Sequence, residues 1–201
     1  MKQAVFLDRD GVITREPPYY AHEISHLEIV PGAAAAIRRL NEHGFLVVVV
    51  SNQAGIARGY YREADMLSFN RAMEDRLAVA GACIDAFYFC PHHPEAGLGE
   101  LLQDCQCRKP KPGMLLKAGR DLGIDLGRSF MVGDRATDIE AGRRAGCQTL
   151  LVLTGHGAEE LKTGTTAGDN VAEDLAGAVE LILGAAGRAD MVPTEDESRS
   201  V

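Results

Sequence analysis

Short apolar runs alternate along this chain with longer segments of helical periodicity. The runs contain almost no polar residues, which is typical of strands buried on both faces of a parallel sheet. We therefore predict strands at Gln3–Leu7, Phe45–Val50, Ile84–Phe89, Ser129–Val132 and Thr149–Leu153.

The segments between these runs predict helices. Apolar residues recur at helical spacing, and glycines follow several of the predicted ends. The predicted helices are Ala33–His43, Arg62–Ala80, Gly113–Leu122, Thr137–Ala145 and Leu175–Leu183. Strands that alternate with helices predict an α/β fold, a three-layer α/β/α sandwich with a central parallel sheet.

Three segments lack periodicity and are expected to be loops: residues 14–30, Cys90–Pro112 and Thr154–Asn170. The Thr154–Gly157 segment is expected to be a plain turn, although closure over the site stays open as an alternative. We expect one domain over residues 1–185 and a polar, disordered tail over residues 186–201.

Composition and charge limit the classes of partner that this chain is expected to bind. The 201 residues carry a formal net charge of −8 without a run of Lys or Arg, which argues against nucleic acid or an anionic membrane as the main partner. No stretch reaches the ~18 apolar residues of a membrane span, and the first strand leaves no room for a signal peptide. We expect a cytoplasmic monomer whose five cysteines are reduced or bound to metal.

Polar residues follow three of the predicted strands directly. They are Asp8 and Asp10, then Ser51 and Asn52, then Gly133-Asp134. Because the carboxyl ends of parallel strands meet at one edge of a sheet, these side chains are expected to share a site.

The two aspartates of the first cluster stand at positions i and i+2 of an extended chain, about 7 Å apart on one side. Asp8 and Asp10 can therefore address one atom or one cation. Asp10-Gly11 alone also fits an ordinary turn after a strand. Two like charges so close together require a metal ion or a proton, which weakens that alternative.

Single residues of the other clusters also have ordinary interpretations. Ser51 is a common helix N-cap, Gly133-Asp134 a common turn, and Lys109 a typical solvated cation. Asp138 is best interpreted as an acidic residue in the first turn of a helix. The joint occurrence of all the motifs, in this order, favours the interpretation that they form one functional site.

That order is Asp-x-Asp-Gly, Ser-Asn, Arg-Lys-Pro and Gly-Asp-x-x-x-Asp, and from residue 5 to about 155 it resembles the haloacid dehalogenase (HAD) phosphatase superfamily. In phosphoryl transfer, Asp8 would attack phosphorus and Asp10 would act as general acid and base. Ser51 would hold phosphate oxygens, and Lys109 would neutralise charge. Asp8, Asp134 and the backbone oxygen of Asp10 suit Mg²⁺.

The irregular segment carries a second metal motif. Cys90 and His92, and Cys105 and Cys107, form two i, i+2 pairs. Four such ligands close a tetrahedral zinc site, which is structural because no position stays open for water. His93 is expected to point away, although an exchange of roles with His92 stays open, as does the alternative of four unrelated residues.

The zinc loop, residues 90–108, would fix the Arg108-Lys109 segment that follows Cys107. The other two cysteines, Cys83 and Cys147, adjoin strands and are expected to be small buried residues. No segment is long enough for a cap domain. The site should therefore be roofed by loops alone: residues 15–22, residues 54–60 and the zinc loop.

Longer sequence strings restrict the resemblance to one family within the superfamily. Ser-Asn-Gln-Ala-Gly-Ile-Ala-Arg-Gly, Cys-Pro-His-His-Pro and Cys-Gln-Cys-Arg-Lys-Pro-Lys-Pro-Gly-Met resemble the D-glycero-D-manno-heptose 1,7-bisphosphate 7-phosphatase family, which is related to histidinol-phosphatases. The resemblance implies a small phosphorylated sugar as substrate, on the route to nucleotide-activated heptose for lipopolysaccharide or S-layer glycans. The substrate-binding residues that it implies are Arg108, Arg135, Asn52, Gln53, Ala54, Tyr19 and Tyr20.

Four other functions stay open at this point. Histidinol-phosphate phosphatase shares the metal loop, and a phosphatase of broader specificity shares the catalytic residues. A phosphomutase uses the same nucleophile but usually needs a cap to exclude water. The fourth alternative is a non-enzymatic scaffold held together by zinc, which would not require Asp8, Asp10 and Asp134 to occur together. Val12 and Thr14 depart from the family's common residues, which bears on specificity rather than chemistry.

Overall fold

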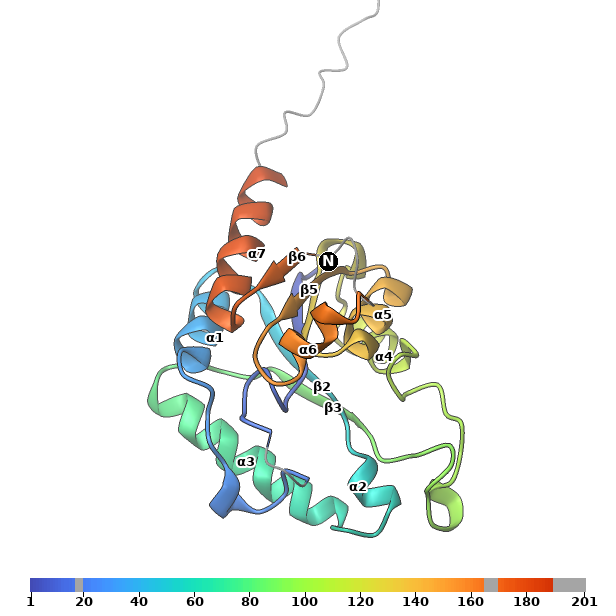
Figure 1. Cartoon of the computed structure of the whole chain (residues 1–201). Helices are drawn as coiled ribbons and strands as arrows, with labels where there is room; N and C mark the ends of the chain where they lie inside the picture. Colours follow the sequence, from blue (N-terminus) through green and yellow to red (C-terminus); the bar gives the residue numbers. More distant parts are fainter. Residues whose placement is uncertain (17–19, 165–169, 190–201) are drawn as a thin grey trace, which may run out of the picture.

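The computed structural model describes residues 1–16, 20–164 and 170–189 (Figure 1). In these ranges six parallel strands form one sheet in the order β3-β2-β1-β4-β5-β6. The strands are β1 (Ala4–Leu7), β2 (Leu46–Asn52), β3 (Ala86–Cys90), β4 (Phe130–Gly133), β5 (Gln148–Val152) and β6 (Asn170–Ala172). The predicted α/β sandwich with a central parallel sheet is confirmed.

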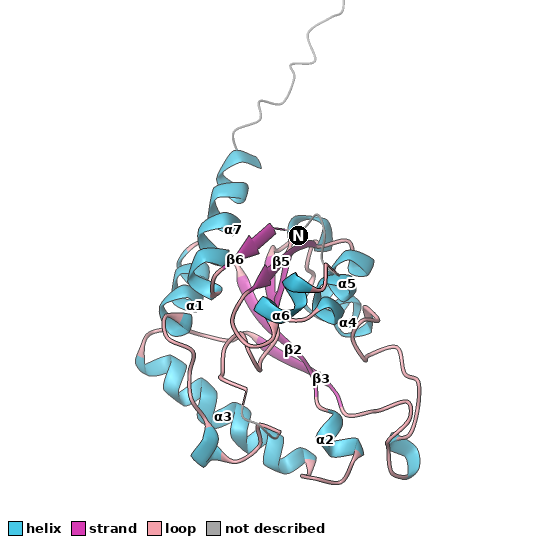
Figure 2. Cartoon of the chain, in the orientation of Figure 1, coloured by secondary structure: helices cyan, strands magenta, loops and turns pink. Residues whose placement is uncertain are grey.

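Helices cover both faces of the sheet (Figure 2). They are α1 (Ala33–Glu42), α2 (Ala54–Ala57), α3 (Glu63–Val79), α4 (Gly113–Leu122), α5 (Ala136–Ala145), α6 (Gly157–Lys162) and α7 (Leu175–Ala189). Three short 3₁₀ helices, Ile24–His26, Gly99–Leu101 and Leu126–Arg128, lie in the described connections.

Successive residues of β1 enter opposite cores because side chains alternate along a strand. Val5 and Leu7 pack with residues of α1, α3 and α7, whereas Ala4 and Phe6 pack with residues of α4 and α5. All four are fully buried. This explains the continuous apolar runs, since neither face of the central strands is polar.

The fold differs from the sequence prediction mainly in its last third. The expected loop Thr154–Asn170 contains α6 and the start of β6, an edge strand too short to give a periodic signal. The last helix continues to Ala189, so the expected boundary at residue 185 falls inside α7. Residues 190–201 of the expected tail lie outside the described residues. Cys83 is exposed, contrary to prediction, whereas Cys147 is buried as predicted.

The order of the strands positions the site. β1 pairs with β2 on one side and with β4 on the other, so the chain order reverses at β1. Ligands of open parallel sheets bind beyond the carboxyl ends of strands at such a switch point. Across the described helices, none has the length and apolarity needed to cross a membrane.

Candidate active site

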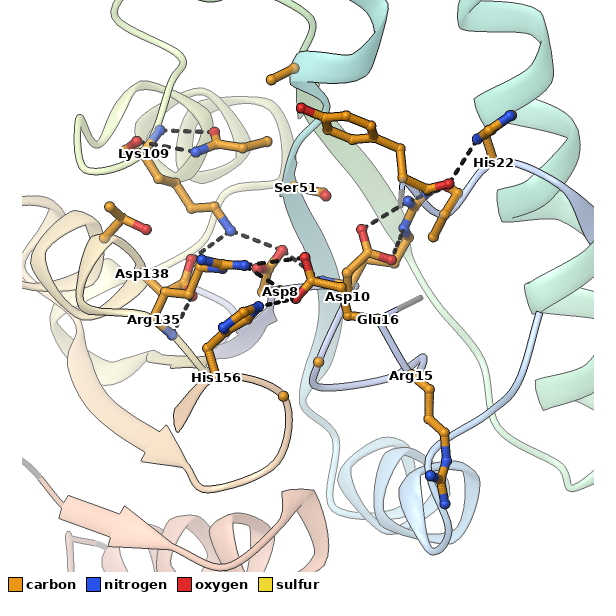
Figure 3. A pocket seen from close by; sticks show the side chains of 18 of the residues that line it. Asp8, Asp10, Arg15, Glu16, His22, Ser51, Lys109, Arg135, Asp138 and His156 are labelled. Atoms are coloured by element: carbon orange, nitrogen blue, oxygen red, sulfur yellow. Dashed lines mark hydrogen bonds and ion pairs between the residues drawn. The ribbon is translucent and has the colours of Figure 1, made fainter. Parts of the chain in front are cut away.

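A cavity of about 1520 Å³ opens at the carboxyl ends of β1, β2 and β4. Asp8 follows β1, Ser51 belongs to the end of β2, and Asp134 follows β4. The cavity brings together Asp8, Asp10, Ser51 and Lys109, four residues that the sequence assigned to catalysis (Figure 3).

Lys109 joins two buried carboxylates. Its Nζ lies 2.9 Å from Oδ1 of Asp8 and 2.6 Å from Oδ1 of Asp138, and it donates to the backbone oxygen of Val50 at 2.8 Å. The three donors of the ammonium group are therefore used within the protein. Burial lowers the pKa of Lys109, but Asp138 and Asp8 raise it more, so the net shift is upward and the residue stays charged.

Two hydrogen-bond donors hold the carboxylate of Asp8 through a single oxygen atom. Its Oδ1 accepts from the backbone N–H of Arg9 at 2.8 Å as well as from Lys109. Burial raises the pKa of Asp8 to about 7; Lys109 opposes that rise, while Asp138 and Asp10 add to it. A cation at this position would favour the charged carboxylate.

Asp134 completes a cluster of three carboxylates with Asp8 and Asp138, whose ligand oxygens lie within 4.8 Å of one another. Oδ2 of Asp134 accepts from the backbone N–H of His156 at 2.8 Å. Oδ1 is buried without a hydrogen-bond partner among the described residues. Burial and the charge of Asp8 raise the pKa of Asp134 to about 8. These oxygen ligands and the unpartnered Oδ1 fit Mg²⁺.

Gly11 allows this close approach. Its backbone has a φ of +84°, and a Cβ atom there would lie 2.2 Å from Oδ2 of Asp134. Glycine is thus required twice at this position, for the left-handed conformation and for space.

Asp10 extends into the cavity from the turn after β1 (Figure 3). Arg9 binds it through both oxygens, with Nε to Oδ1 at 3.0 Å and Nη2 to Oδ2 at 2.8 Å. Thr14 donates to Oδ1 at 3.1 Å. The side chain of Asp10 is 21% exposed, so it remains accessible to a ligand.

The zinc ligands predicted from the sequence converge. Sγ of Cys107 lies 3.1 Å from those of Cys90 and Cys105, and Nδ1 of His92 lies 3.4 Å from Sγ of Cys107. None of these thiols forms a disulfide. Hydrogen bonding from Cys90 lowers the pKa of Cys107 to about 5, which favours the thiolate that binds metal. The donor set fits a closed zinc site.

His93 lies outside this cluster, as predicted. Its Nδ1 accepts from the backbone N–H groups of Glu95 and Ala96, and its Nε2 lies 3.3 Å from Nη2 of Arg58. The loop also reaches the cavity, because His93 and Arg108 line it; Arg108 in addition donates to the backbone oxygen of His92 at 3.3 Å.

Known proteins resemble this chain over nearly its whole length. A family model described as HAD-hydrolase-like matches residues 106–178. The D-glycero-beta-D-manno-heptose-1,7-bisphosphate 7-phosphatase of Pasteurella multocida (strain Pm70) is 45% identical over 185 residues, which cover 92% of this chain and 98% of that protein. The chain belongs to the D-glycero-D-manno-heptose-1,7-bisphosphate 7-phosphatase family.

Two further relatives extend the comparison. The D-glycero-alpha-D-manno-heptose-1,7-bisphosphate 7-phosphatase of Burkholderia mallei (strain ATCC 23344) is 43% identical over 82% of this chain and 87% of its own. The crystal structure of D,D-heptose 1,7-bisphosphate phosphatase from B. bronchiseptica, complexed with magnesium and phosphate, superposes with a TM-score of 0.83 at 36% identity. It covers 92% of this chain and 99% of that one. Members of this family are phosphoric monoester hydrolases.

Asn52 and Gln53, both expected at the substrate, have other partners in this family member. Asn52 brackets the backbone of Lys109, accepting from its N–H at 3.0 Å and donating to its C=O at 3.1 Å. Gln53 is buried and does not line the cavity. It donates to Oγ of Ser51 at 2.7 Å and accepts from the hydroxyl of Tyr61 at 2.7 Å. Asn52 nevertheless lines the cavity, so its place at the substrate stays a prediction, whereas Gln53 is outside the lining and contacts Ser51.

Four of the other expected substrate residues of this phosphatase also line the cavity. Arg108, Arg135, Ala54 and Tyr20 line it, whereas Tyr19 lies outside the described residues. Lining residues also come from the three loops expected as the roof.

Thr154–His156 form the turn that was expected there, and all three residues also line the cavity. Glu16 links this turn to the first loop. Its carboxylate accepts from Nη2 of Arg135 at 3.1 Å and lies 2.7 Å from Nε2 of His156 (Figure 3).

Sequence reasoning missed several site residues. Asp138 was interpreted as a first-turn acid, and it does accept from the backbone N–H of Arg135 at 3.0 Å, but it also neutralises Lys109. The Gly-Asp-x-x-x-Asp motif carried the signal, since it contains both Asp134, which follows β4, and Asp138, in the first turn of α5. Arg9, Glu16, Tyr61 and His156 have no such spacing, so only the fold places them.

Proposed function

We propose that this chain is an Mg²⁺-dependent phosphatase that removes the 7-phosphate of D-glycero-D-manno-heptose 1,7-bisphosphate through an aspartyl-phosphate on Asp8. The observation that carries the proposal is the buried arrangement of Asp8, Lys109 and Asp134 beside the accessible carboxylate of Asp10. The relatives named above support the substrate.

In the first step, an oxygen of Asp8 attacks phosphorus while the bond to the sugar oxygen breaks. Asp10 gives its proton to that leaving oxygen. Oδ2 of Asp8 has no hydrogen-bond partner among the described side chains, so we assign the attack to it. Lys109 supports the step by its charge and by orienting Asp8, because its protons are already donated within the protein.

In the second step, Asp10 takes a proton from water as the water oxygen attacks the phosphorus of the acyl phosphate. The bond between phosphorus and Asp8 breaks, and inorganic phosphate leaves. Ser51 would donate its hydroxyl to a phosphoryl oxygen, since Gln53 already donates to Oγ. Asp8, Asp134 and the backbone oxygen of Asp10 would hold Mg²⁺, whose charge offsets that of the phosphoryl oxygens.

Arg108 and Arg135 support a substrate with a second anionic group. Both line the same cavity as the catalytic residues. A guanidinium offers a planar fork of donors to phosphate or hydroxyl oxygens, whereas it repels the amine of histidinol phosphate. In this structure the carboxylate of Glu16 forms an ion pair with Arg135, so a second phosphate of the substrate would compete with that carboxylate for the guanidinium.

The zinc loop would serve stability and positioning rather than chemistry, because four protein ligands leave no open position. We also propose that the enzyme works as a cytoplasmic monomer. The free thiols support a reducing compartment.

The test compares kcat/KM for both anomers of the heptose bisphosphate, histidinol phosphate and simple sugar phosphates. We expect a preference for a heptose bisphosphate over histidinol phosphate of at least ~10²-fold, about 3 kcal/mol in the transition state. Both anomers are needed because the relatives carry different anomers in their names. Equal turnover of histidinol phosphate would contradict the substrate assignment.

The covalent step needs its own test. Asp8→Asn should lower kcat by at least ~10³-fold while the protein folds normally, because the nucleophile is lost. Borohydride trapping during turnover should modify Asp8 and no other carboxylate. Near-normal turnover by Asp8→Asn would rule out the aspartyl-phosphate.

A further inference from the structure

Arg9 is a charged residue with only 1% of its surface exposed, and it heads the fully buried side chains by volume. It stands between the proposed nucleophile and the proposed acid, yet the reaction described above gives it no task. Burying a guanidinium is costly unless all of its charge and donors are matched. Its contacts therefore show what this burial achieves.

One side of the guanidinium faces the proposed acid and base. Nε and Nη2 bind the two oxygens of Asp10 as a fork, at 3.0 and 2.8 Å. This two-point contact fixes both the position and the plane of the carboxyl group. A lysine at position 9 could supply charge but not the fork.

The opposite side is anchored to the protein framework. Nη1 donates to Oδ1 of Asn70 on α3 at 3.0 Å, and the guanidinium lies 4.7 Å from the ring centroid of Phe69. Nη2 also donates to the backbone oxygen of Ala21 at 2.8 Å, and Gln53 Oε1 lies 3.4 Å away. Ala21 belongs to the loop that lines the cavity.

We propose that Arg9 is a positioning residue that fixes Asp10 for proton transfer and couples its orientation to the loop carrying Ala21. This inference rests on the proposed role of Asp10 as acid and base. Proton transfer requires the carboxyl group within hydrogen-bond reach of the leaving oxygen. The fork holds Asp10 at that position before substrate binds, so less ordering is needed during the reaction.

The alternative is a core arginine that contributes only stability. The two differ in a double-mutant cycle between Arg9→Lys and Asp10→Asn, measured by kcat on the sugar bisphosphate. A residue that acts through Asp10 loses its effect once Asp10 cannot transfer protons. We expect Arg9→Lys alone to lower kcat by ~30-fold or more with KM changed less than ~3-fold, and to cost less than ~2-fold in the Asp10→Asn background.

The dependence of the rate of aspartyl-phosphate formation on the leaving group gives a second test. p-Nitrophenolate leaves without a proton, whereas a sugar alkoxide needs one. In single-turnover experiments, Arg9→Lys should slow formation of the aspartyl-phosphate from the sugar bisphosphate but change its formation from p-nitrophenyl phosphate less than ~3-fold. Equal losses on both substrates, or losses that multiply with Asp10→Asn, would overturn the proposal.

Two further variants control for folding. Met73→Leu disturbs the buried face of α3, the helix that carries Asn70, without changing any contact of the guanidinium named above, so it should lower thermal stability without the kcat effect. If Arg9→Lys does not fold, Asn70→Leu removes the anchor at Nη1 and should show the same non-additivity with Asp10→Asn. An active Asp10→Asn enzyme would refute the proposed acid and base, whereas an additive Arg9 effect with inactive Asp10→Asn refutes this inference alone.

Discussion

Oδ1 of Asp138 lies 2.6 Å from Nζ of Lys109, and both side chains are almost completely buried. The pair links the first turn of α5 to the segment that follows the zinc loop. It also keeps the ammonium group beside Asp8, which lies 2.9 Å away on the other side. An acid on a helix thereby contributes to the position and charge of the residues around the proposed nucleophile.

We expect Asp138→Asn to be costly for both stability and activity. Removing one partner of a buried ion pair costs about 3 kcal/mol, because the remaining charge is left without compensation. The displaced ammonium should lower kcat by ~10²-fold or more. Chemical denaturation and steady-state kinetics measure the two effects. Asp121→Asn is the matched control, since it breaks an exposed pair with Lys117 and should leave both quantities unchanged.

Gly11→Ala should reduce activity and Mg²⁺ affinity far more than Gly44→Ala. Both glycines have a positive φ, +84° and +78°, so each alanine costs about 1 kcal/mol in backbone conformation. A Cβ at Gly11 would lie 2.2 Å from Oδ2 of Asp134, whereas one at Gly44 meets no atom within 4 Å. Activity measured as a function of Mg²⁺ concentration distinguishes the Gly11→Ala variant from the Gly44→Ala variant. Equal loss in both variants would show that backbone strain alone is responsible.

The stability of the metal-free protein should depend on pH through Asp8 and Asp134. Their pKa values in the fold, about 7 and about 8, exceed the unfolded value of about 4. Between these values the folded chain binds more protons than the unfolded chain, so the contribution of both groups to the free energy of unfolding falls as pH rises. Mg²⁺ should offset that loss, and should raise Tm more at about pH 8 than at about pH 5.5.

Asp134→Asn isolates this effect, because it removes one of the two titrating charges. Without metal, the variant should be more stable than the parent at about pH 8 and should gain little from Mg²⁺. The comparison is made by thermal melting of both proteins across the pH range. A variant that loses stability at high pH as steeply as the parent would exclude Asp134 as the source.

Cys107→Ser should release zinc, lower Tm and reduce kcat together. The thiolate closes the site, and the same segment carries Arg108 and Lys109, so a loosened loop displaces the ammonium group. Metal analysis should find about one zinc per chain in the parent, retained through dialysis that removes Mg²⁺. Cys83→Ser, at an exposed cysteine outside the cluster, should change none of these quantities. Unchanged activity in a zinc-free Cys107→Ser protein would disprove the coupling.

Glu16→Gln should strengthen the binding of substrates that carry a second anionic group. The carboxylate neutralises Arg135 and contacts His156 at the mouth of the cavity, and an amide leaves that positive charge to the ligand. We expect KM for the bisphosphate to fall ~3-fold, with a monophosphate unaffected. Glu42→Gln, which breaks an exposed pair with Arg38 outside the cavity lining, is the control. A higher KM would mean that Glu16 orders the loop rather than competing with substrate.

The sequence alone determined the layered fold and the residues contributed by the strand ends. Apolar runs without alternation require burial on both faces, and parallel strands bring their carboxyl ends to one edge. Asp8, Asp10, Ser51 and Asp134 were found in this way. The convergence of the four Cys and His side chains was predicted equally well, because i, i+2 pairs of soft ligands are a local pattern.

Only the tertiary structure decided which partner each side chain has. Asn52 binds the backbone of Lys109, which is 57 positions away, and Glu16 meets Arg135 across 119 positions. No local periodicity encodes such contacts, since they depend on how loops pack over the finished sheet. Arg9 is the clearest case. As a sequence position it is a cation beside two aspartates, and burial against Phe69 and Asn70 makes it the support of Asp10.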